Sequence, residues 1–273
     1  MSKIGVFDSG YGGLTVLKSL VKELPNHDFV YLGDNARAPY GNRSFDIVYE
    51  YTLQCVNWLF DNGCDLVILA CNTASAKALR QIQQVDLPKR SDIKNVLGVI
   101  RPTTEVVGNF SKTNQVGIVG TVGTIRSNSY VIEIEKFFPN IKVYQEACPI
   151  WVHLVENRLV GMSGTDFFVA HHLQKLFLQS PNIDTLILGC THYPLLIDSI
   201  EKCLPPNVKI ISQGEVVAKS LKQYLKLHPE FKLEKHKPGL VEFFTTEQYY
   251  EFNGMASLFY GNTVTAEHIT LHL

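Results

Sequence analysis

The chain has 273 residues, of which 45% are hydrophobic and 19% are charged, and its formal net charge is -1. This composition is typical of a globular protein rather than a disordered or fibrous one, and the length suits one large domain or two α/β lobes. Because lysine and arginine nearly balance aspartate and glutamate and gather in no basic stripe, we expect no nucleic-acid partner.

Short apolar runs alternate with segments of helical period along the chain, a pattern typical of parallel strands joined by crossover helices. The predicted strands are 3–8, 29–33, 65–70, 96–100, 115–120, 141–145, 184–189, 208–211 and 241–245. The predicted helices are 14–24, 44–62, 124–137, 164–179, 193–203 and 213–227. The sequence therefore predicts an α/β fold with doubly wound, mainly parallel sheets.

One unit of the sequence occurs twice, in LVILACNTAS at 66–75 and LILGCTHYPLL at 186–196. Each copy is an apolar strand followed by a small residue, a cysteine and a polar pair, which favours two pseudo-symmetric lobes. We expect the first lobe to comprise 1–98 plus 212–273 and the second to comprise 99–211. Ligands of open α/β sheets gather beyond the carboxyl ends of the strands, so we expect the active site in a cleft between the lobes.

The first predicted strand ends in the glycine-rich turn GVFDSGYGGLTVL at 5–17. Its glycine spacing fits neither the dinucleotide fingerprint nor the P-loop, and no lysine follows it as the P-loop requires. A helix N-terminus at this place suits a carboxylate equally well, which makes Asp8 and Ser9 candidate ligand contacts. The alternative is a tight turn in which Asp8 and Ser9 only cap the helix.

The stretch LGDNARAPYGNRS at 32–44 follows the second predicted strand and reads as a loop, since a proline and a glycine break any helix there. Tyr40 and Gly41 could offer a ring and backbone groups to a ligand. Asp34 and Arg37 could simply pair with each other. By itself, this loop is a weak indication of a binding site.

The stretch VGIVGTVGTIRSNS at 116–129 places hydroxyl residues after a strand for the second time. Thr121 and Thr124 lie near the predicted helix start, where their hydroxyls could bind an anion. Ordinary helix capping by Thr124 is the alternative explanation.

We expect no targeting segment in this chain. A predicted strand follows Met1 at once, and no apolar run approaches the roughly 20 residues that span a bilayer. We therefore expect a cytoplasmic location and no membrane partner.

Six cysteines occur, none of them in a C-x-x-C pair or beside a histidine at zinc-ligand spacing, so we expect neither disulfides nor a metal site. Only Cys71 and Cys190 lie in the repeated unit, between a strand and a predicted helix start. A helix N-terminus brings a thiol pKa from about 8.5 toward neutrality, so each thiol could serve as an acid or a base. His192 and Asp8 are candidates to tune the thiols or to carry protons. Their duplication disfavours the alternative that both cysteines are small core residues.

Two weakly acidic groups that face each other suit the inversion of a carbon stereocentre. One group removes a proton from one face while the other delivers a proton to the opposite face. A single base would have to swing around the substrate or would retain the configuration. Most of the rate would then come from stabilising the carbanion and from placement of the substrate.

Five motifs between residues 7 and 196 carry a resemblance to a known family: FDSGYGGLTVL, GDNARAPYG, ACNTAS, GTVGTI and GCTHYPLL. In this order they resemble the glutamate racemases of the aspartate/glutamate racemase superfamily, and the resemblance extends to the closing segment YGNTVTAEHI. It implies a two-lobed isomerase that needs no cofactor, interconverts L- and D-glutamate and supplies D-glutamate for bacterial peptidoglycan.

The resemblance also implies roles for single residues. Cys71 would act on the D-enantiomer with Asp8 as its helper, and Cys190 on the L-enantiomer with His192 as its helper. The implied substrate contacts are Asp8, Ser9, Tyr40, Gly41, Asn72, Thr73, Thr121, Thr191 and His192, with Thr124 and Glu156 as further candidates.

Other functions stay open at this point. An aspartate or hydantoin racemase would keep both cysteines and alter the carboxylate pocket, whereas an arylmalonate-type decarboxylase keeps only one. A non-catalytic module that closes on an amino acid is a different class, and it would bind glutamate without inverting it. Nothing in the sequence argues for a protein-interaction role such as gyrase inhibition. Glutamate is the expected partner, and a homodimer is left open.

Overall fold

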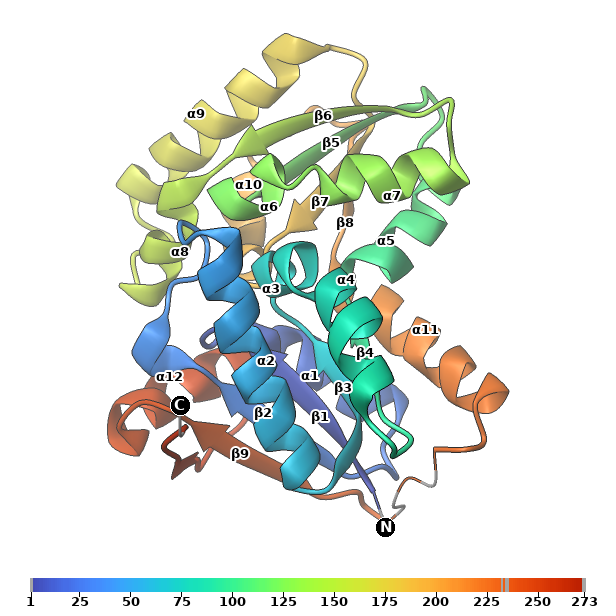
Figure 1. Cartoon of the computed structure of the whole chain (residues 1–273). Coiled ribbons are helices and arrows are strands. Elements are labelled where there is room, and N and C mark those ends of the chain that lie inside the picture. Colours follow the sequence, from blue (N-terminus) through green and yellow to red (C-terminus); the bar gives the residue numbers. More distant parts are fainter. Residues whose placement is uncertain (1, 232, 234–235, 272–273) are drawn as a thin grey trace.

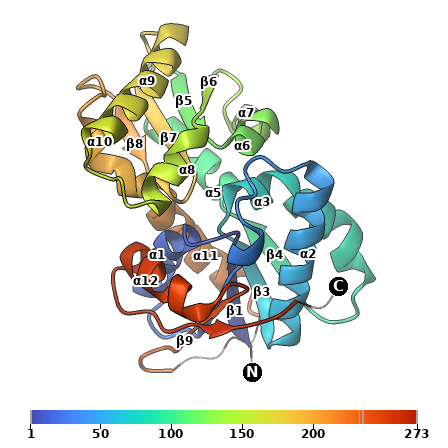
Figure 2. The ribbon, with the colours of Figure 1, turned by 90° about the vertical axis from the view of Figure 1, so that its left-hand side faces the viewer.

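The computed structural model describes residues 2–231, 233 and 236–271. The predicted first lobe, 1–98 plus 212–273, therefore lies partly outside the described residues. In both views the chain forms two α/β layers of unequal size, one above the other (Figures 1 and 2).

The described strands build two sheets, and all strand pairs are parallel. The larger sheet has the order β10-β9-β2-β1-β3-β4 and the smaller one the order β6-β5-β7-β8, which confirms the predicted fold class. The strands are β1 (Lys3–Asp8), β2 (Phe29–Gly33), β3 (Cys64–Leu69), β4 (Asn95–Gly98), β5 (Gln115–Gly120), β6 (Lys142–Ala147), β7 (Thr185–Gly189), β8 (Lys209–Ile211), β9 (Val241–Thr245) and β10 (Glu267–His268).

Helices cover the sheets in the alternating manner of crossover connections. They are α1 (Gly13–Glu23), α2 (Phe45–Asp61), α3 (Asn72–Lys77), α4 (Leu79–Gln81), α5 (Ile100–Val106), α6 (Val122–Arg126), α7 (Ser129–Phe137), α8 (Pro149–Glu156), α9 (Ser163–Gln179), α10 (Ile197–Glu201), α11 (Gln213–Leu227) and α12 (Tyr249–Tyr260). Short 3-10 and π turns complete the set: η1 (Asn35–Arg37), η2 (Ile82–Asp86), η3 (Leu87–Lys89), η4 (Val107–Asn109) and η5 (Tyr193–Leu196).

Two predicted helices differ from those observed. The predicted helix 124–137 is the pair α6 and α7, because Asn128 between them adopts the left-handed conformation with φ of 53°, which asparagine tolerates better than most residues. The predicted helix 193–203 is the 3-10 turn η5 followed by α10. Helices α4, α5, α8 and α12 are additional, because their segments show no clear helical period.

The chain crosses from the larger to the smaller sheet after β4, near Val99, and returns after β8, near Ser212. Beyond the return, β9 pairs with β2 along the register Phe29 to Val241. The strand membership of the two sheets supports lobes of 1–98 plus 212–273 and 99–211, and that division stays a prediction. One apolar cluster contains both Leu17 of α1 and Leu188 of β7, so the layers share a buried core.

Candidate active site

The carboxyl ends of several strands supply the polar side chains of the candidate site. Asp8 ends β1, Cys71 follows β3, Thr121 follows β5 and Cys190 follows β7. Both thiols are only 6% exposed. The two sheets therefore bring the repeated cysteine units of the sequence to neighbouring buried positions, and side chains of the two layers meet there.

The Cys71 thiol lies among hydrogen-bond donors and one carboxylate. Its Sγ accepts a hydrogen bond from the Ala74 backbone N–H at 3.4 Å and lies 3.5 Å from Ser9 Oγ. Asp8 is 1% exposed, and it accepts hydrogen bonds from Gly10 N–H at 2.9 Å and from Thr191 Oγ1 at 3.3 Å. This carboxylate thus connects the surroundings of the first thiol to those of the second.

The acidity of the Cys71 thiol differs from the expectation. Burial, together with the nearby negative charge of Asp8, raises the pKa of Cys71 to about 12, and the hydrogen bonds from Ser9 and Ala74 offset only part of this. The prediction that a helix N-terminus brings this thiol toward neutrality is therefore wrong for the structure, because desolvation disfavours the thiolate more than one N–H stabilises it. Burial also raises the pKa of Asp8, against the opposing positive charge of His192.

The Cys190 thiol has a cationic neighbour instead. His192 Nδ1 lies 3.9 Å from Cys190 Sγ, and His192 Nε2 lies 2.9 Å from Glu156 Oε1. Burial acts to lower the pKa of His192, but the hydrogen bonds and negative charges of Cys190 and Glu156 raise it to about 10. Cys190 leads into a tight 3-10 turn, not the α-helix that we expected, and Tyr193 N–H closes that turn onto the Cys190 carbonyl at 3.2 Å.

The glycine-rich turn after β1 allows the two layers to approach. A Cβ on Gly12 would lie 2.1 Å from Thr191 Oγ1 and 2.6 Å from His192 Nδ1, so only glycine fits there. Gly12 is itself the N-cap of α1, and the Asp8 carboxylate accepts a hydrogen bond from the backbone N–H of Gly13, the first residue of that helix. Asp8 therefore does help to cap α1, and it also accepts a hydrogen bond from Thr191, while Ser9 lies beside the Cys71 thiol.

Three threonine hydroxyls from the two layers form a cluster. Thr121 Oγ1 lies 2.9 Å from Thr73 Oγ1 and 3.1 Å from Thr124 Oγ1, and Thr73 and Thr124 are 3.4 Å apart. Thr121 caps α6 by accepting from Thr124 N–H at 3.2 Å, so the suggestion that Thr124 is the cap is wrong. Gly41 joins this cluster because its carbonyl accepts from Gly123 N–H at 2.8 Å.

The loop that carries Tyr40 and Gly41 is held by a buried polar network. The Tyr40 hydroxyl donates to Asp34, which is 0% exposed. Arg37 Nε also donates to Asp34, at 2.7 Å, which confirms the pairing considered from the sequence. Because its hydroxyl is occupied, Tyr40 supports the loop rather than offering that group, and Gly41 is the part of the loop that reaches Thr121.

Two residues near the thiols were missed in the sequence, namely Tyr130 and Gln213. The Asn72 side chain donates to Gln213 Oε1 at 2.6 Å and accepts from the Tyr130 hydroxyl at 2.7 Å. Gln213 follows β8 at the same distance as Cys71 follows β3. The expectation that ligands gather beyond the carboxyl ends of parallel strands could therefore have found it. Nothing local distinguishes Tyr130, which lies within α7.

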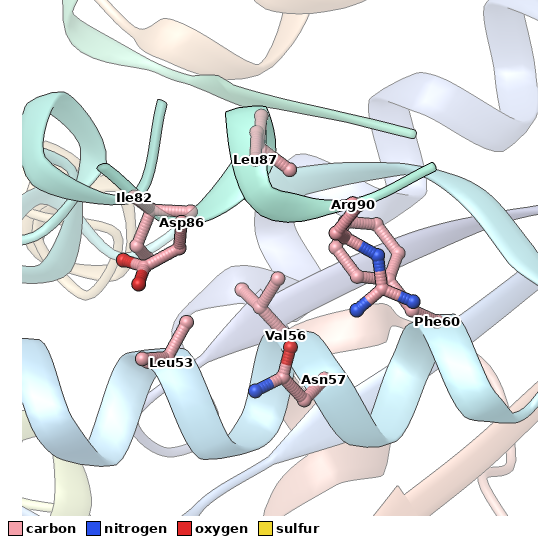
Figure 3. A pocket seen from close by; sticks show the side chains of 8 residues that line it. All are labelled: Leu53, Val56, Asn57, Phe60, Ile82, Asp86, Leu87 and Arg90. Atoms are coloured by element: carbon pink, nitrogen blue, oxygen red, sulfur yellow. The ribbon is translucent and has the colours of Figure 1, made fainter. Parts of the chain in front are cut away.

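One cavity among the described residues adjoins Cys190, and another lies away from both thiols. The first, of about 470 Å³, is lined by Cys190, Thr191 and Gln213, among others. The other, of about 170 Å³, lies between α2 and the turns η2 and η3, where the Arg90 guanidinium is 4.9 Å from the Phe60 ring (Figure 3). The smaller cavity contains no predicted site residue.

The part of the chain that the structure describes contains neither a candidate metal site nor a membrane-spanning helix. Within it, His, Cys, Asp and Glu side chains form no group of three or more that could hold a metal ion. Its helices are too short or too polar to cross a membrane.

Comparisons with known proteins agree over nearly the whole chain. The family model described as Asp/Glu/Hydantoin racemase matches residues 4–221. A glutamate racemase from Persephonella marina is 40% identical over 269 residues, which are 98% of this chain and 97% of that relative. A solved glutamate racemase isoform from Bacillus anthracis superposes with a TM-score of 0.90 at 37% identity, covering 99% of this chain and 98% of the other. A glutamate racemase from Francisella tularensis, solved in complex with D-glutamate, gives a TM-score of 0.88 at 35% identity and the same coverage.

Proposed function

The chain belongs to the Asp/Glu/hydantoin racemase family and racemises glutamate, and we propose that Cys71 and Cys190 are the two groups that move the proton. The observation that carries this proposal is the placement of both thiols beyond the carboxyl ends of β3 and β7, bridged by the hydrogen bond from Thr191 to Asp8. Two proton-transfer groups on opposite faces of a carbon invert it without any movement of the substrate.

In the direction from L- to D-glutamate, the Cys190 thiolate removes the α-proton, and the electron pair of the broken C–H bond stays on the α-carbon, delocalised into the carboxylate. The Cys71 thiol then delivers its proton to the opposite face, which forms the new C–H bond and leaves Cys71 as a thiolate. The reverse direction exchanges these roles. The raised pKa of Cys71 suits a thiol that begins as the donor.

We assign to His192 and Asp8 the return of the two thiols to their starting protonation states between turnovers. His192, whose pKa is raised to about 10, supplies a positive charge 3.9 Å from the Cys190 sulfur. Asp8 lies beside Cys71, and its raised pKa makes it a better proton acceptor than an ordinary aspartate. Glu156 holds the His192 ring through the 2.9 Å contact with Nε2.

Hydroxyl and N–H groups around the thiols suit the two carboxylates and the amine of glutamate. Preorganised donors of this kind are also what stabilises the carbanion as charge develops on it. The proposed substrate contacts are Asp8, Ser9, Tyr40, Gly41, Asn72, Thr73, Thr121, Thr191 and His192, with Thr124 completing the hydroxyl cluster.

We also propose that the product D-glutamate serves peptidoglycan synthesis and that the protein works in the cytoplasm. All six cysteines are free, which suits a reducing compartment.

A homodimer stays a prediction. The exposure of Phe167 and Leu178 on α9, at 66% and 78%, supports contact with a second copy, and light scattering of the purified protein measures it.

The experiment that tests the proposed function is the incubation of L-glutamate with the pure protein, without pyridoxal phosphate, followed by chiral chromatography. We expect a racemic mixture, and in heavy water we expect deuterium at the α-carbon of the product. Glutamate that binds in calorimetry but keeps its configuration would indicate a binding module. Faster inversion of aspartate would indicate an aspartate racemase, and inversion without deuterium uptake would reject proton transfer by thiols.

A further inference from the structure

Three buried side chains form a closed ring of hydrogen bonds beside the thiols. Asn72 Nδ2 donates to Gln213 Oε1 at 2.6 Å, Gln213 Nε2 donates to the Tyr130 hydroxyl at 2.7 Å, and that hydroxyl donates to Asn72 Oδ1 at 2.7 Å. Their exposed fractions are 2%, 4% and 0%. They come from α3, α11 and α7, so the ring joins helices of both layers.

The hydrogen bonds of the ring can run in only one direction from donor to acceptor, and a backbone carbonyl fixes that direction. Gln213 Nε2 also donates to the Val99 carbonyl at 3.2 Å and to Thr103 Oγ1 at 3.3 Å. Because a carbonyl only accepts, the NH₂ group of Gln213 must face Val99, and its oxygen must then face Asn72. Asn72 must therefore donate from its own NH₂ group to Gln213 Oε1. Its side-chain oxygen then accepts the hydrogen bond from the Tyr130 hydroxyl.

This direction leaves one hydrogen-bond donor without a protein partner. Asn72 Nδ2 carries two N–H bonds, and Gln213 is its single acceptor among the described residues. A buried N–H group without an acceptor is costly, so it suits a ligand atom. Asn72 directly follows Cys71, and Tyr130 lies close enough to Cys190 that, besides burial, the charge of that thiolate raises the pKa of the Tyr130 hydroxyl.

We propose that Gln213 and Tyr130 are positioning residues that hold the second N–H of Asn72 toward a substrate carboxylate. Val99 and Gln213 lie where the chain crosses between the two sheets, so the same ring ties the orientation of Asn72 to the arrangement of the layers. This inference rests on the proposed function, since it needs glutamate as the ligand of Asn72. A rotated Asn72 amide would place its oxygen against Gln213 Oε1 and lose both bonds.

The first test is Gln213→Met, which keeps the length of the side chain and removes its polar atoms. We expect KM for both enantiomers to rise about 10-fold, because a hydrogen bond to a charged group is lost, while kcat stays within about threefold. The matched control is Gln223→Met, an exposed glutamine on the same helix α11, which should leave both constants unchanged.

The second test is Tyr130→Phe, which removes only the hydroxyl and keeps the buried ring. A rise in KM similar to that of Gln213→Met is expected, and the double variant should be no worse than the worse single one, since both act through the same amide. Independent structural damage would instead give effects on KM that multiply.

The outcomes separate this inference from the proposed function. A lower melting temperature with unchanged KM in Gln213→Met would overturn the positioning role. If Gln213→Met does not fold, an unchanged KM in Tyr130→Phe overturns it. If the wild-type protein does not racemise glutamate, the proposed function fails instead, and the affinity of wild type and Tyr130→Phe for glutamate in calorimetry still tests the ring, with equal affinities overturning it.

Discussion

The two thiols occupy equivalent places in the two sheets and have opposite electrostatic surroundings. Cys71 lies beside the buried carboxylate of Asp8, which helps to raise the pKa of that thiol, whereas Cys190 lies beside His192, whose own pKa is raised to about 10. Pseudo-symmetry of the strands therefore does not extend to the charges. The pKa of Cys71 is therefore raised beside a carboxylate, whereas Cys190 has a protonated imidazole as its neighbour, and the proposed mechanism gives the two thiols different starting roles.

The largest expected effect comes from removing either sulfur. Cys71→Ala and Cys190→Ala should each lower the racemisation rate by about 10³-fold or more, because each removes a positioned proton-transfer group. Chiral chromatography of both enantiomers measures the loss. A variant that keeps full activity contradicts the two-thiol scheme.

Exchange of the α-proton in heavy water is a second measurement on the same two variants, and it assigns each thiol to one enantiomer. Cys71→Ala keeps the thiol assigned to the L-enantiomer, so its residual exchange of the α-proton should be confined to L-glutamate, and Cys190→Ala should show the converse. Equal exchange of both enantiomers in either variant would show that the two thiols do not divide the faces of the substrate.

A smaller and more one-sided effect is expected for Asp8→Asn, which keeps the shape and removes the charge. Without the acceptor beside Cys71, the D-to-L direction should slow by about 10²-fold, the lower range of general acid–base catalysis, and the opposite direction should slow less. Initial rates with each enantiomer measure the asymmetry. Equal slowing in both directions would mean that Asp8 serves binding and not Cys71 alone.

Glu156→Gln should have a weaker effect on the other half of the site. The neutral amide still reaches His192 Nε2 but no longer stabilises the imidazolium, so the L-to-D rate should fall by about 10-fold, as for the loss of one charge-assisted hydrogen bond. Glu201→Gln, at the exposed last residue of α10, is the matched control and should leave the rate unchanged. A larger loss in the D-to-L direction would place Glu156 with the wrong thiol.

The smallest effect concerns stability against pH. The folded-state pKa of His192 is about 10 and its ordinary value is 6.5, so its stabilising contribution is complete below pH 6.5 and is lost as the pH rises toward 10. Between these values the melting temperature of the wild type should fall by at least about 2 °C more than that of Glu156→Gln. Parallel curves for the two proteins would show that this ion pair adds no stability.

The sequence predicted the parts of the candidate site that depend on the local order of residues along the chain. Asp8, Cys71, Thr121 and Cys190 could be found because each comes directly after an apolar run, and parallel strands end at a common edge. Helices with a regular apolar face, such as α11, were predicted at their observed bounds. The segment between α6 and α7 was not, since a single left-handed Asn128 interrupts an otherwise helical pattern.

Contacts between distant residues and the charges that they create were decided only by the tertiary structure. The hydrogen bond from Asn72 to Gln213 spans 141 residues, and no local pattern encodes it. The high pKa of Cys71 likewise follows from burial against Asp8, which overrides the helix N-terminus on which the sequence argument relied. The sequence by itself determined which strands end in reactive side chains, because the period of apolar residues is local. Packing of the two layers determined which of those side chains meet and how acidic they are, because desolvation and Coulomb interactions depend on distances through space.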